Sequence, residues 1–257
     1  MGISSKQKFL SGLNDEDEIL FAHLYDLACR SEKYGCAMYG DFLSEHAQSE
    51  LRLRKNHLPQ QFFLFGGHDG AERCMAAFAP DEALLDYPIQ AVIIRSSHIS
   101  ALSHRDFLGS IMGLGIKREK CGDIIVMQDK CAAFMTPQAA QTVDRELLKV
   151  GRIGVSTEIS DAASIELPPP SFKEIRGTVA SLRLDALLSL LCGTGRGNTG
   201  ELIRGGRVFV NGICASKGDM RLSGGELISV RGFGRARLEI GGTSRKDRIF
   251  VTLNKYV

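Results

Sequence analysis

The run of three prolines at residues 168–170 constrains the fold of this chain more than any other feature. Consecutive prolines favour an extended polyproline spacer, because proline lacks the backbone N–H that helices and central strands use. No proline follows this run. The sequence therefore predicts a linker over residues 167–173 and a separately folded domain over residues 174–257.

Charge divides at the same place. Residues 173–257 hold fifteen Lys and Arg against seven Asp and Glu, whereas the first 172 residues hold 17 against 23. The net charge of +2 is thus a cancellation between a basic last third, at +8, and an acidic remainder, at −6. A basic block of this kind predicts contact with nucleic acid, although it is also compatible with an ordinary solvated face.

The composition excludes several classes of protein. Hydrophobic residues make up 44% of the 257 residues and charged residues 24%, so a disordered, collagen-like or low-complexity chain is excluded. No segment approaches the ~20 apolar residues of a membrane helix, and the start MGISSKQKFL has no apolar signal region. We therefore expect a monomeric cytoplasmic protein that contacts neither membrane nor DNA.

The seven cysteines form no recognisable site. Their number is odd and no two are spaced as C-x-x-C, which argues against both a disulfide framework and a zinc site. We expect most of them to be small buried hydrophobic residues, and we predict no metal and no cofactor. They are Cys29, Cys36, Cys74, Cys121, Cys131, Cys192 and Cys214.

Residues 1–60 are predicted to form a small helical domain. After Asn14, apolar residues recur with a helical period and acidic residues occupy the first turn. A second helix is expected from Ser44 to about Asn56, because it must stop before Pro59.

Residues 61–166 are predicted to form an α+β domain. The apolar runs FFLFGG and CMAAFAP flank a turn signal, and QAVIIRS is rich in β-branched residues, so three strands are expected. A helix over residues 103–114, two strands, a helix opened by Pro137 and a strand at RIGVSTEI follow. The order βββαββαβ indicates a sheet covered by helices on one side, similar to a ferredoxin-like or RNA-recognition-motif sandwich. The fold class is therefore α+β, in several domains.

The segment from Leu182 to Gly212 carries the most specific pattern, RLDALLSLL followed by GRGNTGELIRGGRVFVNG. It resembles the RNA-binding domain of ribosomal small-subunit protein four, here called the S-four-type domain, in which two short helices precede a hairpin with VNG. The matching residues are Arg183, Leu184, Asp185, Leu188, Arg196, Leu202, Ile203, Gly206, Val208, Val210, Asn211 and Gly212. Gly197 and Gly200 are expected to weaken the second helix by roughly 1 kcal/mol each relative to alanine.

Two groups of basic residues can supply an RNA-binding surface in this domain. The first, around the helix pair and hairpin, has few aromatic side chains, so we expect it to recognise RNA shape and backbone. It consists of Arg183, Arg196, Arg204, Arg207, Lys217 and Arg221, to which the resemblance adds Asp185 and Asn211. The second is predicted to be a basic β-hairpin with Arg231, Arg235, Arg237, Arg245, Lys246 and Arg248.

The start of the second group, RGFG, begins like the RNP1 motif of RNA-recognition domains. The match fails afterwards, because Arg235 and Leu238 stand where aromatic residues are needed. Phe233 is either a base-stacking residue or a packed turn residue.

The segment SHRDFLGSIMGLGIKREKCGDIIV, residues 103–126, together with the C-terminal segment resembles the bacterial YlmH family, also known as photosystem II S-four domain proteins. The likeness extends from about Ser44 to the end of the chain. It implies an N-terminal domain, a central RNA-recognition-motif-like domain and a terminal S-four-type domain. It also implies binding to ribosomal RNA or tRNA on the large ribosomal subunit, in rescue of stalled nascent-chain complexes, and a link to cell division.

Other interpretations of the middle segment are weaker. HRD occurs in kinase catalytic loops, but no Gly-rich phosphate loop or DFG accompanies it, so His104 and Asp106 are expected to be structural. The pair Gly113 and Gly115 lacks the third glycine of a dinucleotide fingerprint and is expected to end a helix. Just beyond, Lys117, Arg118 and Lys120 either contact phosphate or decorate a loop.

An enzymatic role is the main functional alternative, because S-four-type domains are often attached to pseudouridine synthases and RNA methyltransferases. Their catalytic loop G-R-L-D-x-x-(T/S)-x-G and their methyl-donor Gly-rich turn do not occur here. We predict a non-enzymatic RNA-binding factor. The alternatives are an RNA-modifying enzyme with an unrecognised central site and a cell-division factor that binds protein.

Overall fold

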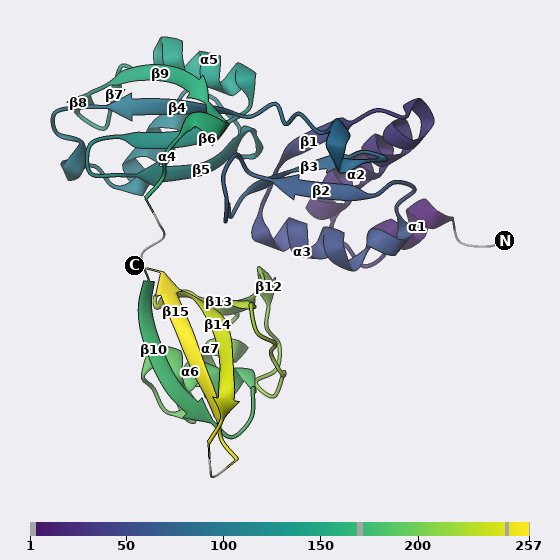
Figure 1. Ribbon diagram of the computed structural model, residues 1–257, viewed down its shortest axis with the longest axis vertical. Helices are drawn as coiled ribbons and strands as arrows, with labels where there is room; N and C mark the ends of the chain where they lie inside the picture. The colour runs from purple at the N-terminus through teal and green to yellow at the C-terminus, as the bar shows by residue number, and fades with distance from the viewer. Residues whose placement is uncertain (1–3, 169–171, 245–246, 257) are drawn as a thin grey trace. The chain divides into compact units, whose positions relative to one another are not determined.

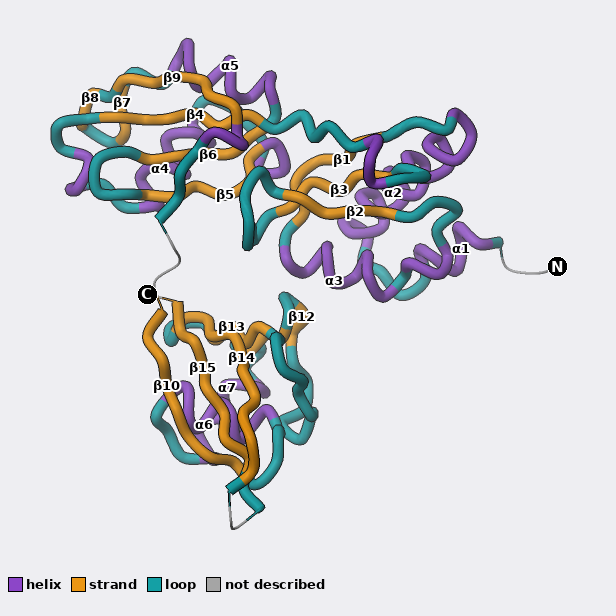
Figure 2. The backbone as a smooth tube through the Cα atoms, in the orientation of Figure 1, coloured by secondary structure: helices purple, strands orange, loops and turns teal. Residues whose placement is uncertain are grey.

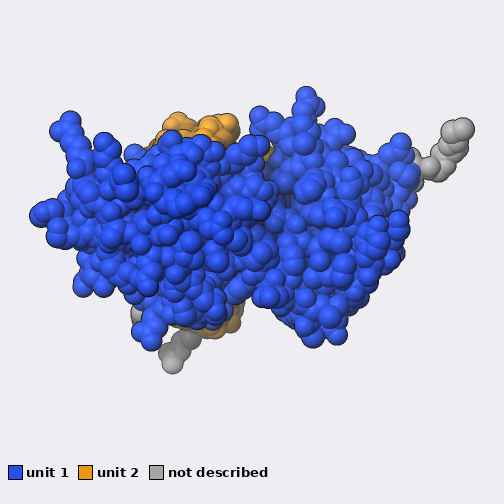
Figure 3. All heavy atoms as spheres, turned by 90° about the horizontal axis from the view of Figure 1, so that it is seen from above, with its two compact units in different colours: residues 1–168 blue, residues 169–257 orange. Residues whose placement is uncertain are grey.

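The chain divides into two compact units, residues 1–168 and 169–257 (Figure 3). The computed structural model describes residues 4–168, 172–244 and 247–256. Within these ranges no helix has the length and apolar character needed to cross a membrane. Three of the seven residues of the predicted linker, 169–171, lie outside them, and its last two residues already belong to a strand that begins at Phe172.

The first eighty residues form helices packed on a three-stranded antiparallel sheet of order β1-β3-β2 (Figure 1). The elements are α1 (Ser5–Leu10), α2 (Asp15–Tyr34), β1 (Met38–Leu43), α3 (Glu45–Leu53), β2 (Phe62–Phe65) and β3 (Cys74–Phe78). The prediction of a purely helical domain over residues 1–60 is wrong. MYGDFL forms β1, and the strands β2 and β3 complete the sheet that β1 begins.

Local sequence explains the limits of the longest helix, α2. The side chain of Asn14 accepts a hydrogen bond from the backbone N–H of Asp17 at 2.9 Å, and four acidic residues fill the first turn. Gly35 ends the helix with φ at 63°, a left-handed conformation that glycine adopts without strain. β1 then passes close to α2, because a Cβ at Gly40 would lie 3.2 Å from Leu24 Cδ2.

The second half of this unit has the chain order βαββαβ. Its elements are β4 (Gln90–Arg95), α4 (His104–Gly113), β5 (Cys121–Val126), β6 (Cys131–Met135), α5 (Pro137–Glu146), the short pair β7 (Lys149–Val150) and β8 (Ile153–Gly154), and β9 (Ser156–Asp161). The antiparallel sheet has the order β5-β6-β4-β9, which is that of a ferredoxin-like sandwich. The expected domain therefore begins near residue 82 rather than 61, since β2 and β3 belong to the first sheet.

Both faces of this second sheet are covered. On one face α4 and α5 bury Val92, Ile94 and Met135. On the other face, residues of β4 and β6 pack against residues of the first sheet and of the segment after β9. The buried side chains of this second layer are Phe42, Met75, Ile89, Ala91, Ile93, Ala132, Phe134 and Ala162. The face of this sheet opposite α4 and α5 is therefore buried as well, whereas the sequence predicted a sheet covered on one side only.

The C-terminal unit is a six-stranded antiparallel sheet with two helices on one face (Figure 2). Its elements are β10 (Phe172–Val179), α6 (Leu184–Cys192), α7 (Arg196–Arg204), β11 (Val208–Val210), β12 (Ile213–Cys214), β13 (Leu227–Val230), β14 (Gly234–Thr243) and β15 (Ile249–Tyr256). The strand order is β10-β15-β14-β13-β11-β12. α7 forms despite its two glycines, because Leu202 and Ile203 are buried in the core beneath it.

Candidate RNA-binding surface

The loop between β12 and β13 is seated at the start of α6. The backbone N–H of Leu184 donates to Met220 O at 2.8 Å, and that of Asp185 donates to Gly218 O at 2.9 Å. A Cβ at Gly218 would lie 3.2 Å from Asp185 Cβ and 3.3 Å from Ile203 Cδ1, so the loop touches both helices. The fold therefore gathers four of the predicted basic residues, Arg183, Arg204, Lys217 and Arg221, into what we call the helix-pair surface.

Asp185 has a definite role on this surface, since it holds Arg183. Arg183 Nε and Nη2 donate to the two carboxylate oxygens of Asp185 at 3.1 and 2.7 Å. These hydrogen bonds raise the pKa of the Arg183 guanidinium. The pair is partly exposed, so its contribution to stability is small. Asp185 thus orients Arg183 and offsets its charge.

Asn211 serves the hairpin turn. Its φ is 50°, and its Oδ1 accepts from the N–H of Leu227 at 2.9 Å while its Nδ2 donates to Glu226 at 3.1 Å. An asparagine tolerates this left-handed backbone better than most residues. Both polar atoms of the side chain are engaged within the domain, so the VNG signature here specifies a turn.

The second basic group lies on the other side of the sheet. β14 and β15 form the predicted antiparallel hairpin. Arg235 and Arg237 alternate along β14 with the buried Ala236 and Leu238, so they point away from the helices. Phe233 packs against the core, which makes it a packed turn residue.

Arg248 of this group is held by internal hydrogen bonds, as is Arg207 of the first group. Arg248 donates to Thr178 Oγ1 at 3.0 Å and to Thr178 O at 2.6 Å, and Arg207 donates to Arg231 O at 2.8 Å. Arg245 and Lys246 lie outside the described residues, as does the side chain of Arg196. The predicted binding residues are therefore distributed over two faces of the unit.

In the N-terminal unit, two of the three secondary candidates are engaged in internal contacts. Lys120 Nζ lies 2.6 and 2.8 Å from the carboxylate oxygens of Asp41, and Arg118 donates to the carbonyl oxygen of Gly122 at 3.1 Å. Lys117 is exposed. Lys120 therefore links the start of β5 to β1 of the first sheet, whereas Arg118 bonds locally to β5, and of the three residues Lys117 is best placed to contact a partner.

Asp106 of the HRD motif has a structural role, as expected. Asp106 accepts hydrogen bonds from the hydroxyl and the backbone N–H of Ser103 at 2.7 and 2.8 Å, which caps α4. These bonds lower the pKa of the Asp106 carboxyl.

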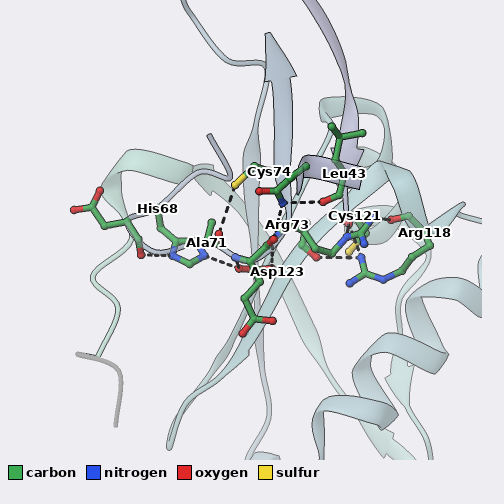
Figure 4. Close-up of polar contacts among 12 residues, drawn as sticks. Leu43, His68, Ala71, Arg73, Cys74, Arg118, Cys121 and Asp123 are labelled. Carbon is green, nitrogen blue, oxygen red and sulfur yellow. Dashed lines mark hydrogen bonds and ion pairs between the residues drawn. The ribbon is translucent and has the colours of Figure 1, made fainter. Parts of the chain in front are cut away.

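A buried polar cluster that the sequence did not indicate joins the two sheets (Figure 4). Asp123 on β5 accepts from the backbone N–H groups of Glu72 and Arg73 at 2.7 and 3.1 Å and lies 3.2 Å from His68 Nε2. Arg73 donates in turn to Cys121 O at 3.1 Å and to Phe42 O at 2.9 Å. The cluster fastens the loop before β3 to the second sheet.

The contacts of His68 in this cluster favour its charged form. Its Nδ1 faces the carbonyl oxygen of Asp69 at 3.0 Å and its Nε2 faces a carboxylate, and neither acceptor carries a proton. Burial disfavours the imidazolium, but the contacts with Asp123 and Asp69 outweigh it, so the pKa of His68 is raised. Burial opposes ionisation of Asp123 too, yet the hydrogen bonds from His68, Glu72 and Arg73 lower the pKa of its carboxyl.

These opposite shifts predict a pH dependence of stability. The raised pKa of His68 contributes stability that is fully present below its ordinary pKa of about 6.5 and is lost as the pH rises through the folded value. The unfolding free energy, measured by urea denaturation, should therefore decline from about pH 6.5 upward. In His68→Gln that decline should be absent, and an unchanged pH profile in this variant would contradict the assignment.

The cysteines are more varied than the sequence suggested. Cys74, Cys121 and Cys131 are buried, whereas Cys36 and Cys214 are exposed. Burial raises the pKa of Cys74 and Cys121 to about 11 and that of Cys131 to about 12, so these three thiols remain protonated at neutral pH.

Comparison with known proteins agrees with this architecture. Residues 82–164, which span the second sheet, match a family model described as the putative RNA-binding domain in YlmH. A Bacillus subtilis (strain 168) protein named ribosome-associated protein quality control protein P2 is 30% identical over 220 residues, covering 84% of this chain and 86% of that protein. The chain belongs to the YlmH family.

A solved structure carries the same family name. It is the cell division protein ylmH from Streptococcus pneumoniae, which is 19% identical with a TM-score of 0.49 and covers 58% of this chain and 94% of that one. The YlmH model match ends at residue 164, so the C-terminal unit with its basic residues lies outside it.

Proposed function

We propose that this YlmH-family chain is a non-enzymatic factor that binds structured RNA on the ribosome through the helix-pair surface. The observation that carries the proposal is the docking of the Lys217–Arg221 loop on α6, which collects basic side chains from three separate segments. Cationic side chains that lie close together bind a phosphate backbone better than the same side chains spread over a surface. The name of the Bacillus subtilis relative, with its ribosome-associated quality control, supports the same assignment.

The finer proposal is that the RNA is ribosomal RNA or tRNA on the large subunit, and that the protein acts as a cytoplasmic monomer on stalled nascent-chain complexes. It rests on the family and on the basic C-terminal unit, with +8 over residues 173–257. The runner-up is an RNA-modifying enzyme. Incubation of the full chain with ribosomal RNA, followed by a search for modified nucleotides, separates the two, since any stoichiometric modification would contradict a purely binding role.

RNA binding by the basic C-terminal unit, of which the helix-pair surface is a part, predicts a steep dependence on salt. If about six phosphates are neutralised, the slope of log K against log salt for ribosomal RNA should be near −4 to −5, from about −0.7 to −0.9 per contact. The variant Arg204→Ala/Lys217→Ala/Arg221→Ala removes three of these contacts. Its slope should fall in magnitude by about 2 to 3, with an affinity loss of about tenfold or more at constant salt.

A matched control removes the same charge elsewhere. Lys8, Arg52 and Lys55 are exposed on the N-terminal unit and lie outside residues 82–164, so Lys8→Ala/Arg52→Ala/Lys55→Ala changes the net charge equally. Its salt slope should stay near that of the native chain. Equal effects of the two triple variants would show that net charge, rather than the helix-pair surface, determines binding.

A further inference from the structure

The sheet of the C-terminal unit has one face that no helix covers within residues 172–244 and 247–256. Figure 1 shows α6 and α7 behind β10, β15 and β14. Side chains toward the helices, such as Val251 and Leu253, are buried in the core. Their neighbours along each strand point to the opposite face, because side chains alternate along a strand.

A single row of side chains crosses this open face. Phe209 pairs with Ser229, Ser229 with Arg235, and Tyr256 with Phe172, while Arg235 lies over the Tyr256 ring at 5.3 Å. The row therefore runs over five neighbouring strands, β11, β13, β14, β15 and β10, a span of about 19 Å at ~4.8 Å per strand. We call it the cross-strand row.

The aromatic members of the row are arranged for contact with a partner. Phe172 is 40% exposed, although its ring meets Tyr256 edge-on with centroids 4.9 Å apart. Arg231 lies over Phe209 at 5.1 Å. Between them, Ser229 Oγ is buried and has no hydrogen-bond partner in the described part of the chain. Phe209 and Tyr256 are half-buried, so each of these rings keeps part of its surface open to a partner.

We propose that the cross-strand row binds an unpaired stretch of RNA by stacking its bases on Phe172, Tyr256 and Phe209. Aromatic rings and guanidinium planes stack on any base, and the same arginines can reach the phosphates. The helix-pair surface lies on the other side of the sheet, so this is a second contact of a different kind. The inference rests on the proposed function in that the ligand is RNA.

Charge favours RNA over a protein partner on this face. The arginines Arg176, Arg235 and Arg237 lie on its strands, and Arg248 is fixed at its edge by Thr178. The acidic residues on the same face of these strands, Glu174 and Glu239, are hydrogen-bonded to Arg176 and Asn254. Arginine side chains therefore lie around a row of aromatic rings on this face. Proteins that bind single-stranded nucleic acid use this combination.

The test measures binding of the full chain to a fluorescently labelled single-stranded RNA of about eight nucleotides. Phe172→Ala/Tyr256→Ala should weaken binding about 5- to 150-fold, the range for loss of one stacked base. The salt slope should not change, because stacking releases no counterions. Tyr256→Phe keeps the ring and should bind as the native chain does. Arg235→Lys keeps the positive charge but lacks the planar guanidinium group. Its affinity for the oligonucleotide should therefore fall several-fold, while the salt slope stays unchanged.

Phe250→Ala is the matched control. Phe250 is 48% exposed on the same face but lies outside the row, opposite Thr178. Its removal should leave oligonucleotide affinity unchanged. Thermal melting of every variant establishes that it is folded.

Several outcomes would overturn the proposal. They are unchanged affinity in Phe172→Ala/Tyr256→Ala, an equal loss in Phe250→Ala, or a loss in Tyr256→Phe as large as in the double variant. If the chain binds structured ribosomal RNA but not the oligonucleotide, base stacking on the cross-strand row is rejected and the proposed function stands. If it binds neither RNA, the proposed function is rejected. Loss of ribosome association with RNA binding intact would make the face a protein-docking site.

Discussion

Asp123→Ala should lower the unfolding free energy of the N-terminal unit by about 3–5 kcal/mol. The substitution removes the carboxylate that accepts from the N–H groups of Glu72 and Arg73 and that faces His68 Nε2. Buried donors that lose their acceptor each cost about 1–3 kcal/mol, and here the side chains of Asp123 and His68 are only 13% exposed. Urea denaturation followed by circular dichroism measures the change.

Two variants make this expectation specific. Asp144 is exposed on α5, so Asp144→Ala should stay within about 0.5 kcal/mol of the native chain. A double-mutant cycle of Asp123→Ala with His68→Gln isolates the coupling between the two side chains, because the double variant lacks both partners of the pair. If Asp123→Ala costs no more than the exposed control, the cluster does not hold the two sheets together.

Gly66→Ala should destabilise the same unit by about 3 kcal/mol or more. A Cβ at this position would lie 2.3 Å from Ala71 Cβ and 2.5 Å from Arg73 O, and neither neighbour can rotate away. The backbone of residues 71–73 must shift, and that backbone donates the two hydrogen bonds to Asp123. The steric strain and the loss of these hydrogen bonds therefore both lower the unfolding free energy.

The control for this prediction has the opposite sign. Gly109 lies within α4 and a Cβ there would meet nothing within 4 Å. Gly109→Ala should stabilise the chain by up to about 1 kcal/mol, since alanine favours the helix and restricts the unfolded state. Similar urea-denaturation midpoints for Gly66→Ala and Gly109→Ala would show that the close packing around Gly66 is unimportant for stability.

Local patterns predicted most helices and strands, but they failed where pairing is remote. MYGDFL has no clear alternation, and its role as β1 depends on β3, more than thirty residues later. The same limitation assigned β2 and β3 to the wrong sheet. A strand's partner is a tertiary property, so apolar runs predict that a strand forms without indicating which sheet it joins.

The arrangement of the predicted basic residues did not follow from the sequence. No local pattern indicates that Asp185 holds Arg183, or that Lys120 reaches Asp41 of the first sheet while Arg118 bonds to its own strand. The cross-strand row was also missed, because Phe172 and Tyr256 are separated by most of the C-terminal unit and are joined only by the β10–β15 pairing. The alternation of apolar and polar residues along IFVTLNKY was the sequence signal that Tyr256 would lie on the face opposite the core.

The ferredoxin-like order was predictable, whereas the use of its sheet was not. RNA-recognition motifs bind bases on the face opposite the helices. Here that face is closed by Phe42 and Met75, and Phe134 in its centre is fully buried. RNA contact by the region that matches the family model would therefore have to use its edges or loops, with Lys117 the exposed basic residue near one of them.

The pairing of β10 with β15 sets the order in which the protein can fold during synthesis. β10 is the first strand of its unit and lies at a sheet edge, with eight residues matched to β15, the last strand. Until residues 249–256 have been made, β10 lacks its partner and the unit's core lacks Val251 and Leu253. The N-terminal unit can mature early, but the basic unit matures late, through contacts of long sequence separation that form slowly. A nascent copy therefore completes this unit only after residues 249–256 have been synthesised.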